Sequence, residues 1–137
     1  MSPRATGSCL CGAVSFQIDG GFDTFFLCHC SRCRKGTGSA HGANLFASQA
    51  RLTWARGQAH IRNYALSGTR HARSFCGTCG SALPMTQFDG ALIVVPAGSL
   101  DTPVEIKPTA RICMSDAAPW AEHLDAVPGL PGLPGQT

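Results

Sequence analysis

Cys28-His29-Cys30-Ser31-Arg32-Cys33 sets three thiols in one short stretch, and a cysteine pair lies on either side of it, Cys9-Leu10-Cys11 and Cys76-Gly77-Thr78-Cys79. A Cys-x-x-Cys turn can present two thiolates to one metal ion, as in zinc knuckles. On a straight strand the two thiols of a Cys-x-Cys would lie about 6.6 Å apart, farther than the sulfurs around one tetrahedral zinc. The chain must therefore bend at the first pair, and Gly7 and Gly12 beside it make a bend easy.

The seven thiols in these groups divide into one closed site with four cysteines and one site with three cysteines and an open position. A closed site is structural, whereas three protein ligands leave room for a substrate. Cys113, the eighth cysteine, or His41 could instead fill the open position and make both sites structural. A disulfide framework is disfavoured because the N-terminal residues show no signal peptide, and a redox Cys-x-x-Cys because no βαβ pattern accompanies it.

The composition indicates one folded domain that is rich in turns. The chain has 137 residues, of which 44% are hydrophobic and 14% charged, with Gly 16 and Pro 9. Its net charge of +3 is too small to indicate nucleic-acid binding. No apolar stretch approaches the roughly 18 residues that span a membrane. We therefore expect a cytoplasmic protein without membrane or nucleic-acid partners, in a compartment that keeps thiols reduced.

Short alternating segments bounded by turn residues predict a mostly β domain with little helix. The expected strands cover residues 14–18, 24–28, 41–47, 61–66, 71–75, 82–86, 91–96 and 109–114. Ser31 is expected to cap a single helical turn that ends at Lys35. Residues 1–125 form the expected metal-binding domain, and residues 126–137, rich in Gly, Leu and Pro, a C-terminal tail.

A zinc ion held by three thiolates is a weaker Lewis acid than one held by three neutral histidines, and it suits a soft fourth ligand such as another thiolate. A substrate thiol bound there would be deprotonated and held as a nucleophile. Arg32, Arg34 and Lys35 surround the triplet, where they either dock the carboxylates of an anionic thiol or form an ordinary solvated face. His29 lies between two ligands, and we expect it to pack behind them rather than to act as an acid or base.

Five motifs occur in a fixed order along the chain: Gly7-Ser-Cys-Leu-Cys-Gly-Ala-Val14, Cys28-His-Cys-Ser-Arg-Cys-Arg-Lys35, Phe75-Cys-Gly-Thr-Cys-Gly80, Gly98-Ser-Leu-Asp101 and Pro119-Trp120. Together they resemble the glutathione-dependent formaldehyde-activating enzyme family, whose domain is shared with centromere protein V. The resemblance covers roughly residues 7–124, and its three-part cysteine signature is specific.

The resemblance implies a small β-tent fold, in which antiparallel sheets are joined by zinc, and it also suggests a homodimer. It implies one structural zinc and a second, catalytic-type zinc. The implied ligands are Cys9, Cys11, Cys76 and Cys79 for the structural ion, and Cys28, Cys30 and Cys33 for the second. The family's named activity is the condensation of glutathione with formaldehyde to S-(hydroxymethyl)glutathione. Arg111-Ile112-Cys113 and the Gly-Leu-Pro tail depart from the family pattern.

The main hypothesis is therefore a zinc-dependent carbon–sulfur lyase that acts on a thiol–aldehyde adduct. The predicted catalytic residues are Cys28, Cys30 and Cys33, and the predicted substrate-binding residues are Arg32, Arg34 and Lys35. The alternative is an interaction module in which both zinc ions are structural and the basic loop contacts a protein or a nucleic acid. A zinc buffer is a third interpretation, disfavoured because a buffer needs neither a full core nor a closed site.

Overall fold

The computed structural model describes residues 3–135, which form eleven strands and one α-helix. The strands are β1 (Arg4–Ser8), β2 (Ser15–Asp19), β3 (Thr24–Cys28), β4 (Gly42–Ala47), β5 (Arg51–Arg56), β6 (Ile61–Ala65), β7 (Ala72–Cys76), β8 (Ala82–Leu83), β9 (Met85–Gln87), β10 (Leu92–Pro96) and β11 (Ala110–Ile112). The helix is α1 (Ser31–Thr37), and five 3-10 turns follow at Gln58–His60, Ala97–Ser99, Met114–Asp116, Pro119–Ala121 and Leu124–Ala126. The prediction of a mostly β domain with little helix is confirmed.

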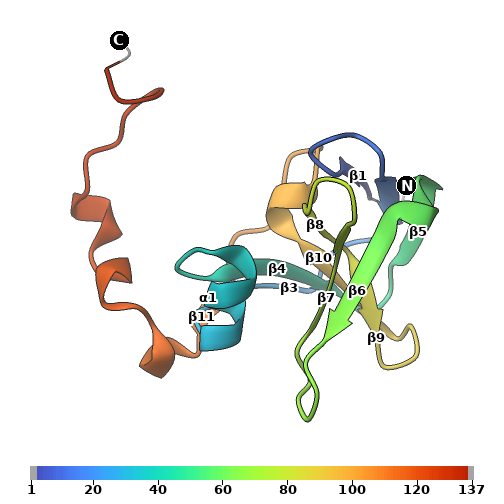
Figure 1. Ribbon diagram of the computed structural model, residues 1–137, viewed down its shortest axis with the longest axis horizontal. Helices are drawn as coiled ribbons and strands as arrows, with labels where there is room; N and C mark the ends of the chain where they lie inside the picture. Colours follow the sequence, from blue (N-terminus) through green and yellow to red (C-terminus); the bar gives the residue numbers. More distant parts are fainter. Residues whose placement is uncertain (1–2, 136–137) are drawn as a thin grey trace.

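The strands form three sheets, with the orders β1-β2-β5, β11-β3-β4-β10-β9 and β6-β7-β8 (Figure 1). Every named pairing is antiparallel except that of β11 with β3, which is parallel. In β3, Cys28 pairs with Gly42 of β4 on one side and with Ile112 of β11 on the other. An inner strand of the large sheet, β3, therefore delivers the chain directly to the three-cysteine motif.

The core forms where the alternating faces of the first two sheets meet. Phe16 and Ile18 of β2 are almost completely buried, and so are Leu45 of β4 and Val95 of β10. The ring of Phe16 also meets Trp54 of β5 edge to face, with centroids 5.9 Å apart. Full burial of such side chains contributes about 1.5–3 kcal/mol each, which is what holds the sheets together around the cysteine turns.

The helix begins and ends differently from the prediction. Cys30, and not Ser31, is the N-cap, because its Sγ accepts a hydrogen bond from the backbone N–H of Cys33. The helix also continues beyond Lys35 to Thr37, and it ends where Gly38 adopts a left-handed conformation and donates its N–H to the carbonyl of Arg34. The predicted cap and end were therefore wrong, because a thiol took the capping position that is usual for a hydroxyl.

Strands β1 and β5 were not predicted, and the predicted strand 82–86 is divided. Pro84 has no N–H to donate to a ladder, so β8 ends before it in one sheet and β9 begins after it in another. Strand β5 lies at a sheet edge with alternate residues exposed. The other predicted strands are present, with ends that differ by at most two residues.

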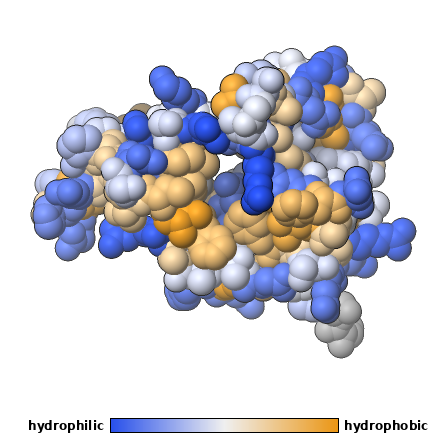
Figure 2. Space-filling view, turned by 90° about the horizontal axis from the view of Figure 1, so that it is seen from below, coloured by the Kyte–Doolittle hydropathy of each residue, from blue (hydrophilic) through white to orange (hydrophobic). Residues whose placement is uncertain are grey.

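The C-terminal residues beyond β11 leave the body of the molecule and run along one side as short 3-10 turns (Figure 1). Trp120, Val127 and Leu130 are each about 60% exposed in this segment. From below, Figure 2 shows hydrophobic atoms gathered on both sides of a hollow, with hydrophilic groups reaching into it. The boundary at residue 125 stays a prediction. Within residues 3–135 the structure contains no helix that is long and apolar enough to cross a membrane.

Candidate metal centres and an adjoining cleft

Four cysteines from two distant turns form the first cluster. The Sγ atoms of Cys9, Cys11, Cys76 and Cys79 all lie within 4.8 Å of one another. The turn at the first pair closes through a hydrogen bond from Gly12 N–H to the Cys9 carbonyl at 3.1 Å, with Gly12 at φ +81°. This is the predicted bend, and it brings the Cys9 and Cys11 sulfurs to 3.6 Å.

The spacing of these sulfurs fits a tetrahedral metal ion. Zinc–sulfur bonds of about 2.3 Å place neighbouring sulfurs about 3.8 Å apart. The Cys9–Cys11 distance is 3.6 Å and the Cys11–Cys76 distance is 3.9 Å. The cluster could therefore hold a metal ion without rearrangement of the turns. Its ligands would connect residues that are 65 positions apart in the chain.

Hydrogen bonds favour the thiolate form of two thiols in this cluster, those of Cys9 and Cys79. The pKa of Cys11, in contrast, is raised to about 11 by burial and by the neighbouring thiols of Cys9, Cys79 and Cys76. The backbone N–H of Val14 donates to Cys9 Sγ at 3.2 Å. The Cys79 sulfur lies 3.2 Å from the Ser81 hydroxyl. That hydroxyl, with the backbone N–H groups of Cys11 and Ser81, lowers the pKa of Cys79 to about 5. At least one thiol of the cluster is thus ionised at neutral pH before any cation arrives.

The second cluster contains Cys28 at the end of β3, Cys30 at the N-cap of α1 and Cys33 in its first turn. Their Sγ atoms also lie within 4.8 Å of one another. Gly42, opposite Cys28 in β4, keeps the space beside the cluster open, because a Cβ there would lie 3.6 Å from Cys33 Sγ. The structure thus brings the predicted triplet together as a second group that could hold a metal ion.

The electrostatics of the triplet require a cation if all three thiols are to ionise. Burial raises the pKa of Cys33, and the neighbouring thiols of Cys28 and Cys30 raise it further. Burial also raises the pKa of Cys28, with smaller contributions from the thiols of Cys30 and Cys113. A set of closely spaced thiols of this kind matches soft metal ions such as zinc.

His29 and His41 pack against each other, with ring centroids 5.0 Å apart. His29 is 3% exposed, and within residues 3–135 neither of its ring nitrogens has a hydrogen-bond partner. Burial lowers the pKa of His41, and the nearby His29 lowers it further. The alternative in which His41 completes the triplet finds no support in this arrangement, because the grouped ligand atoms in the described part of the chain do not include it.

A cleft of about 330 Å³ opens beside Cys33. Its walls come from α1, β4, β7 and β10, and its basic side chains are His71 and Arg73. Nothing in the sequence pointed to these two residues, because only the folded β6–β7 hairpin brings them to the cleft beside Cys33. Arg32, Arg34 and Lys35 do not line the cleft. Arg32 and Lys35 are exposed and Arg34 is half-buried, so their substrate-binding role stays a prediction.

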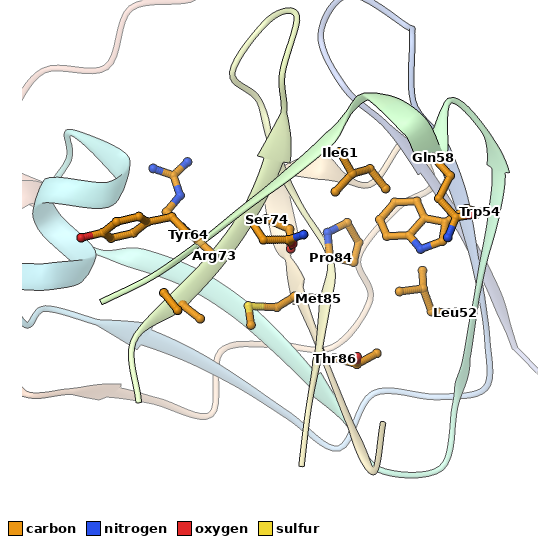
Figure 3. A pocket seen from close by; sticks show the side chains of 13 residues that line it. Leu52, Trp54, Gln58, Ile61, Tyr64, Arg73, Ser74, Pro84, Met85 and Thr86 are labelled. Carbon is orange, nitrogen blue, oxygen red and sulfur yellow. The ribbon is translucent and has the colours of Figure 1, made fainter. Parts of the chain in front are cut away.

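A second hollow, of about 360 Å³, adjoins the cleft and shares Ala72, Arg73, Ser74 and Met85 with it (Figure 3). Leu52, Trp54 and Ile61 form its apolar end. Its lining contains no cysteine. The cleft beside Cys33 is therefore the better candidate for chemistry, although it is slightly smaller.

Comparisons with known proteins agree with this arrangement. The family model for "Glutathione-dependent formaldehyde-activating enzyme" matches residues 4–116. A relative from Halomonas elongata, provisionally named a glutathione-dependent formaldehyde-activating enzyme, is 32% identical over 126 residues, which cover 85% of this chain and 78% of the relative. A Rhodobacter sphaeroides protein of solved structure is 25% identical with a TM-score of 0.60, and the match covers 77% of this chain and 98% of that one. With its two cysteine clusters, its fold and these matches, the chain belongs to the glutathione-dependent formaldehyde-activating enzyme family.

Proposed function

We propose that the protein is a zinc-dependent carbon–sulfur lyase that makes and cleaves a thiol–aldehyde adduct, as an S-(hydroxymethyl)glutathione synthase does. The observation that carries the proposal is the position of Cys33, which belongs both to the three-cysteine cluster and to the wall of a cleft large enough for a small ligand. The family match supports glutathione and formaldehyde as the thiol and the aldehyde.

Two zinc ions complete the proposal. Cys9, Cys11, Cys76 and Cys79 would hold a closed, structural ion, and Cys28, Cys30 and Cys33 would hold the second. When bound, the second ion would lower the pKa of a thiol in the cleft. We further propose that the protein works as a homodimer in the reducing cytoplasm, where these thiols stay available for metal.

The reaction needs little from the protein beyond positioning. The thiol sulfur attacks the carbonyl carbon of the aldehyde, the carbon–sulfur bond forms, and the carbonyl electron pair moves to oxygen. The proton released by the thiol passes through solvent to that oxygen, so the hemithioacetal is neutral and no electrons are lost or gained. The cleft walls would hold the thiol against the cysteine cluster and restrict its orientations. Arg32, Arg34 and Lys35 would attract an anionic thiol from the surface of α1.

The test combines metal content with exchange kinetics. Elemental analysis of the protein, purified under reducing conditions, should give two zinc ions per chain, and one in Cys33→Ser. Exchange of ¹³C-formaldehyde with S-(hydroxymethyl)glutathione, followed by NMR, must be measured against the uncatalysed rate, because hemithioacetals also form without help. We expect the wild-type protein to accelerate exchange and Cys33→Ser to lose the acceleration. Two zinc ions without acceleration would contradict the proposal and favour an interaction module with two structural ions.

A further inference from the structure

The cleft beside Cys33 has a basic end that the thiol chemistry does not use. His71 and Arg73 lie on the β6–β7 hairpin, across the cleft from the cysteine cluster. No aspartate or glutamate is among the residues that line the cleft. The balance of charge in this space is therefore positive.

Arg73 is held in place but is not neutralised. Its Nη1 donates to the carbonyl of Gly36 at 2.9 Å, and its guanidinium lies 5.3 Å from the ring centroid of Phe75. A guanidinium has five N–H donors, so this carbonyl leaves several available. The only ion pair in residues 3–135 is between Arg4 and Asp19. Arg73 thus reaches the cleft as a half-buried cation without a carboxylate partner in the described chain.

His71 and Arg73 converge on one space. The point where a Cβ on Gly36 would stand is 4.0 Å from His71 Nε2 and 3.9 Å from Arg73 Nη1. Glycine at this position leaves that space open. Arg73 also lines the hollow of Figure 3, at the end opposite Trp54, and its side chain extends there on the side of α1. The two side chains therefore frame a pocket end that could accept both oxygens of one carboxylate.

We propose that His71 and Arg73 form the subsite that binds a carboxylate of the thiol substrate, while the thiol lies at Cys33. This inference rests on the proposed function for the identity of the thiol, and it adds residues that discriminate among thiols. Burial lowers the pKa of His71, and Arg32 and Arg73 lower it further. His71 is consequently neutral at pH 7, where it can donate one hydrogen bond beside the charged Arg73. A carboxylate would supply the missing negative charge.

The test measures binding of four ligands to the zinc-loaded protein by calorimetry. Glutathione has a thiol and two carboxylates, glutathione ethyl ester lacks the glycine carboxylate, 2-mercaptoethanol has a thiol alone, and S-methylglutathione has carboxylates without a free thiol. We expect Arg73→Gln to lower the affinity for glutathione about 10- to 100-fold. We expect His71→Gln to lower the affinity for glutathione by a smaller factor, and all variants to bind 2-mercaptoethanol with the same affinity. Equal binding of glutathione and its ester by the wild type would assign the contact to the γ-glutamyl carboxylate.

Arg70→Gln is the matched control, because Arg70 is exposed on the same hairpin and does not line the cleft. Arg73→Lys keeps the charge and should recover part of the affinity for glutathione, whereas a purely structural role for the hydrogen bond to Gly36 predicts that Arg73→Gln weakens binding of 2-mercaptoethanol as well. Zinc content and melting temperature must be measured for each variant. The inference is overturned if Arg73→Gln weakens binding of glutathione and of 2-mercaptoethanol equally, or if Arg32→Gln or Lys35→Gln causes a larger selective loss than Arg73→Gln.

S-methylglutathione separates this inference from the proposed function. If Arg73→Gln weakens binding of S-methylglutathione, while zinc does not increase the affinity for free thiols, the carboxylate subsite is supported and the lyase proposal fails. If thiols bind and react, but Arg73→Gln does not change the affinity for S-methylglutathione or glutathione, the subsite is wrong and the lyase proposal stands. If no ligand binds, both are wrong.

Discussion

Removal of one ligand from each cysteine cluster should destabilise the protein by different amounts. Cys11→Ser and Cys33→Ser each remove one thiol, and Cys11 is exposed, so its replacement leaves no cavity. The four-cysteine cluster joins positions 65 residues apart, whereas the triplet lies within one short loop. A metal cross-link stabilises the fold by restricting the unfolded chain, and the restriction grows with the loop that it closes.

The chain-entropy relation for cross-links gives about 4 kcal/mol for a 65-residue loop and about 2 kcal/mol for a loop of roughly five residues. In a domain of this size, 1 kcal/mol corresponds to about 4 °C in melting temperature. We therefore expect Cys11→Ser to lower the melting temperature by about 15 °C, and the lost cross-link in Cys33→Ser to lower it by about 8 °C. Cys33 is also partly buried, so lost packing adds to its shift and acts against the predicted order.

The assay is thermal unfolding followed by circular dichroism on zinc-loaded protein under reducing conditions. Elemental analysis must show that each variant has lost one of two zinc ions. Removal of both ions with a chelator should then equalise the melting temperatures of the wild type and Cys11→Ser. Equal shifts for the two variants, or a larger shift for Cys33→Ser, would refute the reasoning that the distant cysteines cross-link the domain.

Two further predictions concern residues outside the clusters. Gly57→Ala should lower the free energy of unfolding by more than about 2 kcal/mol, because its Cβ would meet the Ala13 carbonyl oxygen at 1.9 Å and its φ is +78°. Gly68→Ala is the control: its φ is +76°, but no atom lies within 4 Å of the added Cβ, so it should cost only about 1 kcal/mol. Equal losses of unfolding free energy in chemical denaturation would contradict the steric argument. Asp23→Asn tests a pH dependence, because hydrogen bonds from the hydroxyl and backbone N–H of Ser48, at 2.7 and 2.8 Å, lower the pKa of Asp23. The ionised Asp23 carboxylate should stabilise the fold by about 1 kcal/mol above the ordinary pKa of about 4, and this stabilisation should disappear as the pH falls through the lower pKa of the folded state. A stability difference between wild type and Asp23→Asn that stays constant from pH 7 to pH 2 would count against this assignment.

The sequence predicted the fold best where the pattern was local. The strand at residues 24–28 matches β3 at both ends, because its apolar run ends at the cysteine motif. Strand β1 escaped prediction because Ala5 and Gly7 are small, and only the folded chain shows them packed against the core. Strand β5 escaped because an edge strand with exposed alternate residues has little apolar signal.

In the candidate site, too, the local part was predictable from the sequence and the part assembled by the fold was not. The spacing of the cysteines predicted a division into sets of four and three, because each turn is a few residues long, and the family resemblance implied which cysteines form each set. Only the folded chain shows that the turns at Cys11 and Cys76, 65 positions apart, meet. The spacing could not show that His71 and Arg73 face Cys33, since a hairpin from another sheet carries them there. A search for a cation on the strand leading into Cys76 could have suggested Arg73, but nothing local distinguishes it from Arg70.

Strand β7 connects the four-cysteine cluster to the cleft beside Cys33. It ends at Cys76 of the four-cysteine cluster, and about 13 Å away its other end carries the basic wall of the cleft. A metal ion bound at Cys76 would anchor the strand that positions Arg73. If that anchoring changes the affinity of the cleft for its ligand, the ligand would in turn change the affinity of the four-cysteine cluster for its ion by the same factor.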